Sequence, residues 1–330
     1  MLRFATRITT RWSAVAARVA SAALAVLAAG AGGERARGAT DGGTPAIAAG
    51  VTTIVDDLGD TLRLPAARGE RRLVSLNPTT TEIVFALGLG DRLVGRSRWD
   101  AWPAEAARVP SVGDGIRPNV EAILAAHPTL VVLYASADNR PAARALRAAG
   151  IATLSVRVDS IAEFRRVTRM LGDVLGVPER GRAIVDSVDA TLARVRRATR
   201  DAARPTVLWR AWDAPLMVIG GGSYFTELVD IAGGRNAFAD DARPSPQVSF
   251  EEVLRRNPDH VLAGDSAAAA AMRGDARWRT LPAVRDGRVL VVDGELLARP
   301  SVRLGEAAVH LASRLHPSLA ASLQLPAVAR

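Results

Sequence analysis

The sequence predicts an α/β protein of two similar lobes, each with a mostly parallel sheet, joined by a single long bridging helix and with a ligand cleft between the lobes. Three observations lead to this fold class. Short, unbroken apolar runs alternate with helix-like segments, as is typical of parallel strands covered on both faces. One long amphipathic segment interrupts the alternation. A stretch of the first half of the chain also recurs in the second half.

Length and composition are those of a globular protein. The chain has 330 residues, 48% of them hydrophobic and 23% charged, which is enough for two domains of ~100–200 residues each. Cysteine is absent. This excludes disulfides, thiolate metal sites, a thiol nucleophile and a lipid-modified N-terminal cysteine.

The N-terminus has the pattern of a secretory signal. Four arginines precede the apolar run 19–29, which is shorter than the ~17 residues that a membrane span requires. We expect residues 1–40 to be a signal and flexible leader that is cleaved, with an uncleaved anchor as the alternative. Cleavage near residue 40 would remove six arginines and one glutamate and lower the formal net charge from +9 to +4. A modestly basic exported protein is a poor candidate for nucleic-acid binding.

The first predicted lobe covers residues 51–177. It opens with two β-prone runs around Gly59, which predict a small hairpin. Apolar runs that predict strands then alternate with segments that predict helices. The strands are expected at 73–76, 93–95, 130–134 and 151–156, and the helices at 80–87, 120–126 and 141–149.

The bridging helix is predicted over residues 178–203. Ile184, Val188, Leu192 and Val195 follow one another at four, four and three residues, with arginine and aspartate between them, which gives one apolar stripe. The alternation then resumes in a second lobe over residues 204–318. Its strands are expected at 206–209, 216–219, 260–263 and 288–292.

The two lobes contain an internal repeat. Residues 120–133 align with residues 250–263, and a glutamate, an aliphatic residue, a leucine, a proline and a valine recur in register. Each copy predicts a helix that is ended by proline and followed directly by a buried strand. Two similar lobes favour a ligand at the carboxyl ends of their strands, in a shared cleft.

Patterns typical of catalysis are absent from the sequence. The four histidines, at positions 127, 260, 310 and 316, are scattered and lack metal-ligand spacing; a structural role is expected for His127 and His260. Residues 220–224 read Gly-Gly-Gly-Ser-Tyr and are similar to an anion-binding turn, but without lysine no nucleotide-binding P-loop is possible. Ser223 as a helix N-cap is the alternative. We therefore predict no catalytic residue, no metal site and no cofactor.

Tryptophans form two pairs with the same spacing. Trp99 and Trp102 follow one predicted strand, and Trp209 and Trp212 follow another in the second lobe. They predict aromatic ligand contacts from both lobes, with anchoring of each core as the alternative. Further predicted ligand contacts are the flanking Arg98 and Arg210, and Tyr134 at the end of its strand.

Glutamates stand near the start of two predicted helices. Glu82 follows Thr79 and Thr80, and Glu251 follows Ser249. By themselves these patterns favour helix capping, because a carboxylate complements the positive end of a helix.

Several motifs resemble a known family. The sequences Val-Ser-Leu-Asn-Pro-Thr-Thr-Thr-Glu-Ile-Val-Phe-Ala-Leu-Gly-Leu-Gly-Asp-Arg-Leu-Val-Gly (74–95), Trp-Asp-Ala-Trp-Pro-Ala-Glu (99–105), Pro-Ser-Val-Gly (110–113) and Asn-Val-Glu-Ala-Ile-Leu (119–124) are similar to those of periplasmic cobalamin and ferric-siderophore binding proteins of ABC importers. The resemblance covers residues 51–315. It implies two α/β lobes bridged by a rigid helix, with a corrinoid or an iron chelate held between them.

The resemblance also implies which residues bind. A glutamate of each lobe docks onto arginines of the permease in this family, and by motif these are Glu82 and Glu251. The internal repeat pairs Glu251 with Glu121 instead, so Glu121 is the alternative. Ser245 and Gly115 stand where the family has aromatic residues. Two arginines near the last strand of the second lobe would favour an anionic siderophore or haem; they are Arg299 and Arg303.

From these observations we expect a non-enzymatic binding protein of the periplasm. It would capture a corrinoid and deliver it to an ABC permease dimer with its ATPase. We expect a monomer that meets the membrane only through the permease and binds no nucleic acid. Ferric siderophore or haem binding is the alternative within this class, and an exported metal-dependent enzyme on the same scaffold is a remote alternative.

Overall fold

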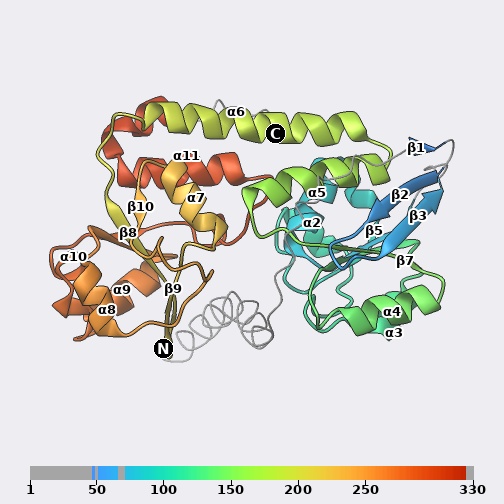
Figure 1. Cartoon of the computed structure of the whole chain (residues 1–330), viewed down its shortest axis with the longest axis horizontal. Helices are drawn as coiled ribbons and strands as arrows, with labels where there is room; N and C mark the ends of the chain where they lie inside the picture. Colours follow the sequence, from blue (N-terminus) through green and yellow to red (C-terminus); the bar gives the residue numbers. More distant parts are fainter. Residues whose placement is uncertain (1–46, 49–50, 66–70, 325–330) are drawn as a thin grey trace, which may run out of the picture. The chain divides into compact units, whose positions relative to one another are not determined.

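The computed structural model describes residues 47–48, 51–65 and 71–324, and the predicted signal lies outside them. These residues form two compact units (Figure 1). We call residues 47–188 and 300–302 the N-terminal unit, and residues 189–299 and 303–324 the C-terminal unit. Each is an α/β unit with a mostly parallel sheet, which confirms the α/β class and the two similar lobes that were predicted.

The N-terminal unit is built on a parallel sheet of four strands in the order β5-β4-β6-β7. The helix α3 packs with α4, and α2 packs with α5. A small antiparallel sheet, β1-β2-β3, precedes them and contains the predicted hairpin. The strands are β1 (Ile47–Ala48), β2 (Val51–Val55), β3 (Thr61–Pro65), β4 (Leu73–Ser75), β5 (Leu93–Arg96), β6 (Leu130–Tyr134) and β7 (Ala152–Val156), and the helices are α2 (Pro78–Ala86), α3 (Val120–Ala125), α4 (Arg140–Ala148) and α5 (Ile161–Val174), with 3₁₀ turns η2 (Gly90–Arg92) and η3 (Ala104–Arg108).

One aspartate attaches the hairpin to the main sheet of this unit. The buried Asp56 accepts hydrogen bonds from the backbone N–H groups of Leu58 (3.0 Å) and Asp60 (2.9 Å) in its own turn, and from that of Ser155 in β7 (3.0 Å). A carboxylate that accepts several N–H groups satisfies donors that would otherwise be buried without a partner. The turn geometry and the hairpin's position are therefore fixed by the same side chain.

The long helix α6 runs from Pro178 to Ala198. Val188, Leu192 and Val195 of the predicted stripe are buried on it. The boundary between the two units falls inside α6, between Val188 and Asp189. Its action as a rigid bridge remains a prediction.

The C-terminal unit contains a five-stranded sheet. Strands β10, β8, β11 and β12 are parallel neighbours, and β9 pairs antiparallel with β8. The elements are β8 (Thr206–Asp213), β9 (Leu216–Val218), β10 (Arg235–Asn236), β11 (His260–Ala263), β12 (Val289–Val291), α7 (Tyr224–Ile231), α8 (Phe250–Arg256), α9 (Ser266–Gly274), α10 (Pro282–Arg285), α11 (Leu304–Leu315) and α12 (Ala320–Leu323), with 3₁₀ turns η4 (Trp278–Thr280) and η5 (Pro317–Leu319).

The short segment 300–302 belongs to the N-terminal unit although it lies between two parts of the other. Its attachment includes a hydrogen bond from the Thr79 hydroxyl of α2 to the carbonyl oxygen of Pro300 (3.2 Å). The sequence does not predict that residues 300–302 belong to the N-terminal unit, because a segment of three residues is too short to show an apolar run or a helix pattern.

The internal repeat has the same local structure in both units. Helices α3 and α8 each lead into a buried strand, β6 and β11 respectively. After each helix one non-glycine residue has positive φ, His127 (48°) and Asn257 (41°), and a proline follows. A left-handed residue ends a helix by turning the chain away from its axis. The predicted helix–proline–strand unit is thus confirmed in both copies.

Within the residues that the structure describes, none of the helices combines the length and apolar character needed to cross a bilayer.

Candidate functional site

Trp99 lies in the loop that leaves β5 at the carboxyl end of the parallel sheet of the N-terminal unit. It is half-buried, and the guanidinium carbon of Arg98 lies 4.4 Å from the centre of its ring. Arg98 also forms an ion pair with Asp114. Trp102, three residues further on, is half-buried as well. The structure therefore places Arg98 and Trp99 in contact as a stacked cation–π pair.

Buried polar residues fix this loop to the interior of the N-terminal unit. Ser97 and Asp100 flank the pair and are buried, with 0% and 1% exposure. The Asp100 carboxylate accepts hydrogen bonds from the hydroxyls of Ser97 (2.5 Å) and Thr81 (2.6 Å). Burial raises the pKa of Asp100 even though these hydrogen bonds lower it, because removal from water disfavours the charged form. With both flanking residues turned inward, Arg98 and Trp99 are left on the outer side of the loop.

Tyr134 ends β6, also at the carboxyl edge of the sheet. Its hydroxyl donates a hydrogen bond to the carboxylate of Asp159 (2.7 Å), just beyond β7. Burial and the nearby Asp159 charge raise the pKa of Tyr134 far above its usual value. The phenol is therefore neutral and acts as a donor. Sequence analysis did not identify Asp159, because a lone aspartate before a helix is usually a cap or turn residue.

The tryptophans of the C-terminal unit lie inside a strand, so the prediction that they follow one is wrong. Trp209 and Trp212 both belong to β8, which continues to Asp213 because β9 folds back and pairs with it. Trp209 makes an edge-on contact with Phe225 of α7, at 4.5 Å between ring centres. The indole N–H of Trp212 donates to the carbonyl of Ala214 (2.8 Å). Both side chains are half-buried.

Arg210 is held between an acid and an aromatic ring. It pairs with Asp213 at 3.3 Å, and its guanidinium lies 5.5 Å from the ring centre of Trp278, leaving 18% of its side chain exposed. Asp213 also accepts a hydrogen bond from Arg277 at 2.7 Å. Trp278 is fully buried. Sequence analysis missed Trp278 because it stands outside the repeated spacing of the other tryptophans.

The two predicted arginines near the last strand lie in the C-terminal unit, separated by the segment 300–302. Arg299 donates to the Glu295 carboxylate at 3.2 Å, and 20% of its side chain is exposed. Arg303 stands at the N-cap position of α11 and is half-buried. Their contact with a ligand remains a prediction.

Of the three glutamates considered for docking, two are exposed. Glu121 and Glu251 lie in the first turns of α3 and α8, the equivalent helices of the repeat. Glu82 is 1% exposed. Its helix α2 is buried from Thr79 to Val84, so the side chain points into packed structure and does not lie on an accessible rim. This burial contradicts the docking role that the motif implied for Glu82.

Two positions where the resemblance calls for aromatic residues are buried and carry small residues. A Cβ atom on Gly115 would lie 2.2 Å from the carbonyl oxygen of Leu76, far closer than non-bonded atoms approach. Ser245 is 5% exposed. An aromatic side chain at position 115 would therefore require a shift of the backbone.

The glycine run 220–222 is packed against another backbone segment. Cβ atoms there would lie 2.1–2.2 Å from carbonyl oxygens of residues 239–243, and the N–H of Gly221 donates to the carbonyl of Asp241 (2.6 Å). The N–H groups of Gly220 and Gly221 are therefore already used within the protein. Ser223 caps α7 by accepting from the N–H of Phe225 (3.3 Å), so the N-cap interpretation is confirmed.

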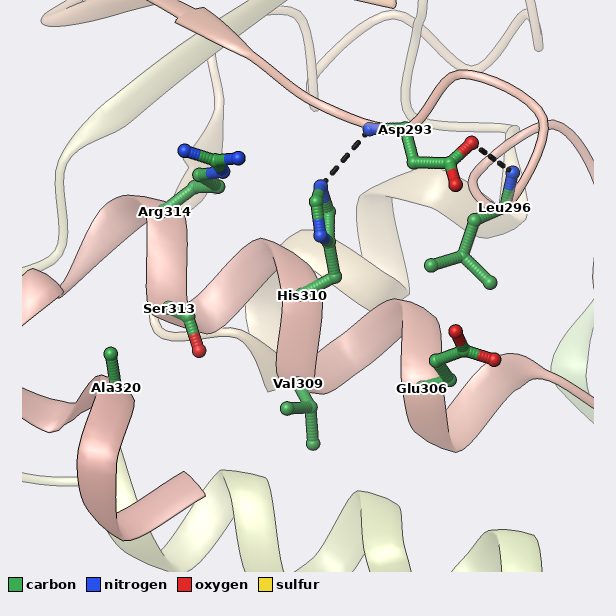
Figure 2. A pocket seen from close by; sticks show the side chains of 8 residues that line it. All are labelled: Asp293, Leu296, Glu306, Val309, His310, Ser313, Arg314 and Ala320. Atoms are coloured by element: carbon green, nitrogen blue, oxygen red, sulfur yellow. Dashed lines mark hydrogen bonds between the residues drawn. The ribbon is translucent and has the colours of Figure 1, made fainter. Parts of the chain in front are cut away.

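A pocket of about 490 Å³ lies along α11 in the C-terminal unit (Figure 2). His310 projects into it, and its Nε2 atom accepts a hydrogen bond from the N–H of Asp293 (3.0 Å). Burial lowers the pKa of His310, and the positive charge of Arg314 lowers it further. The lining residues are Asp293, Leu296, Glu306, Val309, His310, Ser313, Arg314 and Ala320. None of the predicted ligand residues is among them.

Histidine, aspartate and glutamate side chains do not gather in groups of three that could hold a metal ion anywhere in the described part of the chain.

Comparisons with known proteins identify relatives across most of the chain. The family model for periplasmic binding proteins matches residues 73–296. The uncharacterized ABC transporter substrate-binding lipoprotein YvrC of Bacillus subtilis is 30% identical over 257 residues, which are 75% of this chain and 80% of that protein. The fold is similar to that of the periplasmic vitamin B12 binding protein BtuF of Vibrio cholerae (TM-score 0.65, 28% identity, 75% of this chain and 97% of that one). It is also similar to the periplasmic heme-binding protein RhuT of Roseiflexus sp. RS-1 (TM-score 0.67, 27% identity, 78% and 100%).

Proposed function

This chain belongs to the periplasmic binding protein family, and we propose that it is the substrate-binding component of an ABC importer for a large metal chelate, with a corrinoid as the leading ligand. Support for the class comes from YvrC, named as an ABC transporter substrate-binding lipoprotein, and from neighbours named for vitamin B12 and heme binding. The protein acts by binding and release, without catalysis.

The observation that carries the proposal is the Arg98–Trp99 pair. An accessible aromatic ring beside a guanidinium, at the carboxyl end of a parallel sheet, is where α/β proteins place ligands. The ring supplies a flat apolar surface and the guanidinium supplies orientation. Trp102 and Tyr134 extend the same edge of the N-terminal unit.

Ferric siderophore or haem binding is the second candidate. It is favoured by Arg299 and Arg303, whose charges would pair with carboxylates of an anionic chelate. Against this stands the existing contact of Arg299 with Glu295, which already neutralises one of the two arginines. We therefore place the corrinoid first.

Docking to the permease is assigned to Glu121 and Glu251. Both are exposed, both lie in first helical turns, and the repeat makes them equivalent between the units. At Glu251, hydrogen bonds from its own backbone N–H and from Ser249 lower the pKa of the carboxyl. A carboxylate that stays ionised is suited to pairing with arginines of a partner.

The protein is proposed to work in the periplasm as a monomer after signal cleavage, and to meet the membrane only through the permease and its ATPase. YvrC is named a lipoprotein, whereas this chain has no cysteine to carry a lipid. We expect the mature protein to be recovered in the soluble periplasmic fraction without detergent. Recovery with the membrane in the absence of the permease would contradict cleavage.

The function is tested by titrating mature protein with cyanocobalamin, haemin and a ferric hydroxamate siderophore, followed by calorimetry and by tryptophan fluorescence. We expect saturable 1:1 binding of cyanocobalamin with quenching. Binding of haemin or the siderophore alone would favour the second candidate. Failure of all three would contradict the proposed function.

Docking is tested separately with charge reversals. Glu121→Arg and Glu251→Arg should leave ligand affinity unchanged and abolish uptake through the permease reconstituted in vesicles. Glu227→Arg is the matched control, because Glu227 is also an exposed first-turn glutamate, on α7. Equal loss of uptake in the control would contradict a specific docking role.

A further inference from the structure

Asp114 receives three hydrogen-bond donors on one carboxylate. Its Oδ2 atom accepts from the Arg98 guanidinium, and its Oδ1 atom accepts from the N–H of Ile116 (2.9 Å). The third donor is the side chain of Trp99, which has the indole N–H as its only donor. One carboxylate therefore joins both members of the Arg98–Trp99 pair.

The turn that carries Asp114 is fixed to the loop of Trp99 by backbone contacts. The N–H of Arg98 donates to the carbonyl of Gly113 (2.9 Å), and Gly113 pairs with Pro118 across the turn. Gly113 has a φ of 118°, a conformation that favours glycine. The hydrogen bond from Ile116 closes an Asx turn and fixes the Asp114 side chain. The turn and the Ile116 N–H therefore fix the position of the carboxylate independently of its contacts with Arg98 and Trp99.

We propose that Asp114 is a positioning residue, which keeps the Trp99 ring and the Arg98 guanidinium as a preformed platform for the ligand. This rests on the proposed function, because the platform is the ligand contact proposed there. Sequence analysis did not single out Asp114, since it lies in a separate motif from Trp99 and 15 positions further along the chain.

The physical advantage is preorganisation. Arginine and tryptophan side chains lose rotamer freedom when a ligand immobilises them, and that loss weakens binding unless it has already occurred in the free protein. Asp114 also balances the charge of Arg98, so the platform presents a flat and nearly neutral surface. Partial burial would raise the pKa of Asp114, but its hydrogen bonds from Ile116, Arg98 and Trp99 lower it overall. The contacts therefore persist at neutral and mildly acidic pH.

The test compares Asp114→Ala with the control Asp91→Ala, an exposed aspartate of η2 in the same unit. Asp114→Ala should weaken cyanocobalamin binding by about tenfold and reduce the near-UV circular dichroism of the ligand-free protein, because the Trp99 ring becomes mobile. Asp91→Ala should change neither. Asp114→Asn should recover part of the cyanocobalamin affinity and part of the near-UV circular dichroism, since an amide oxygen still accepts one hydrogen bond.

The mechanism is checked by a double-mutant cycle with Trp99→Ala. If Asp114 acts through Trp99, its substitution should have little further effect on affinity once the ring is gone. Full additivity of the two losses, or unchanged affinity and unchanged near-UV circular dichroism in Asp114→Ala, would overturn the proposal. If the wild-type protein binds no chelate, the proposed function fails, and the circular dichroism of the ligand-free variants still decides whether Asp114 orders Trp99.

Discussion

The two tryptophan pairs have identical spacing in the sequence but different surroundings in the two units. Trp99 lies in a loop beyond β5, under an arginine whose side chain is 56% exposed. Trp209 lies within β8 and packs edge-on against Phe225, and its neighbour Arg210 is 18% exposed over the buried Trp278. In each unit an aspartate holds the arginine, but Arg98 faces outward, whereas Arg210 packs over the buried Trp278.

This difference teaches that spacing alone does not give a residue its role. A tryptophan in an anchored loop at a strand end can offer a face to a ligand, whereas one inside a hairpin strand has neighbours on either side. We therefore expect substitutions around Trp99 to change mainly ligand affinity. Substitutions around Arg210 should change mainly the free energy of unfolding.

The largest effect that would test this comparison is expected from Trp278→Ala. Removal of a fully buried tryptophan leaves a cavity and should lower the free energy of unfolding by about 4 kcal/mol. Trp99→Ala should lower it by less than about 1 kcal/mol while weakening cyanocobalamin binding. Urea denaturation of both variants measures the first quantity and calorimetry the second. Equal destabilisation by the two substitutions would break the comparison.

A second test concerns the position below the Trp99 loop. Gly115→Ala would place a Cβ atom 2.2 Å from the Leu76 carbonyl oxygen, and the required backbone shift should cost about 2 kcal/mol. Gly274→Ala is the control, because nothing lies within 4 Å of its added Cβ. It should be neutral or slightly stabilising. Urea denaturation that shows the same midpoint for both variants would mean that the backbone at Gly115 yields easily.

A third, smaller effect separates the two aspartates. Asp213→Ala leaves Arg277 and Arg210 without their partner next to the buried Trp278 and should lower the free energy of unfolding by about 1–2 kcal/mol. Asp114→Ala should lower it by less, by about 1 kcal/mol or under, because Arg98, its ion-pair partner, is 56% exposed and remains solvated without it. Thermal and urea unfolding of both variants measure the difference. A larger loss in Asp114→Ala would reverse the roles assigned to them.

Much of the fold could be predicted from the sequence because its signals are local. Unbroken apolar runs predicted the bounds of β6 and β7 to within one residue. The helix–proline–strand pattern predicted the local structure of both copies of the repeat. The length of β8 was underestimated, because its second half begins and ends with a charged residue and is not an unbroken apolar run, and it pairs with β9. The return of residues 300–302 to the N-terminal unit depends on a tertiary contact that leaves no periodic pattern.

The candidate site was predicted less completely, since its geometry depends on contacts between distant residues. The Arg98–Trp99 pair could be found because the two residues are adjacent in the sequence, with Arg98 directly before the first tryptophan of its pair. Asp114 could not be found, because its link to Trp99 comes from the way the turn after η3 folds back. Glu82 was misjudged because its docking role came from a motif, which does not indicate burial, while α2 is buried from Thr79 to Val84. Capping patterns identify helix ends without indicating which face is covered.

The smallest expected effect is a difference in how the two units respond to acid. In the N-terminal unit burial raises the pKa of Asp100, so its folded form binds a proton more readily than its unfolded form, and this unit is stabilised as pH falls toward the usual aspartate range. In the C-terminal unit burial lowers the pKa values of His260 and His310. Their unfolded forms take up protons first, so this unit loses stability as pH falls below about 6.5.

Hydrogen exchange at pH 7 and pH 5, corrected for intrinsic rates, should therefore show protection lost in the C-terminal unit and retained in the N-terminal one. His310→Gln should reduce that loss, because glutamine can still accept from the Asp293 N–H but does not titrate; equal loss of protection in both units would remove this difference between them.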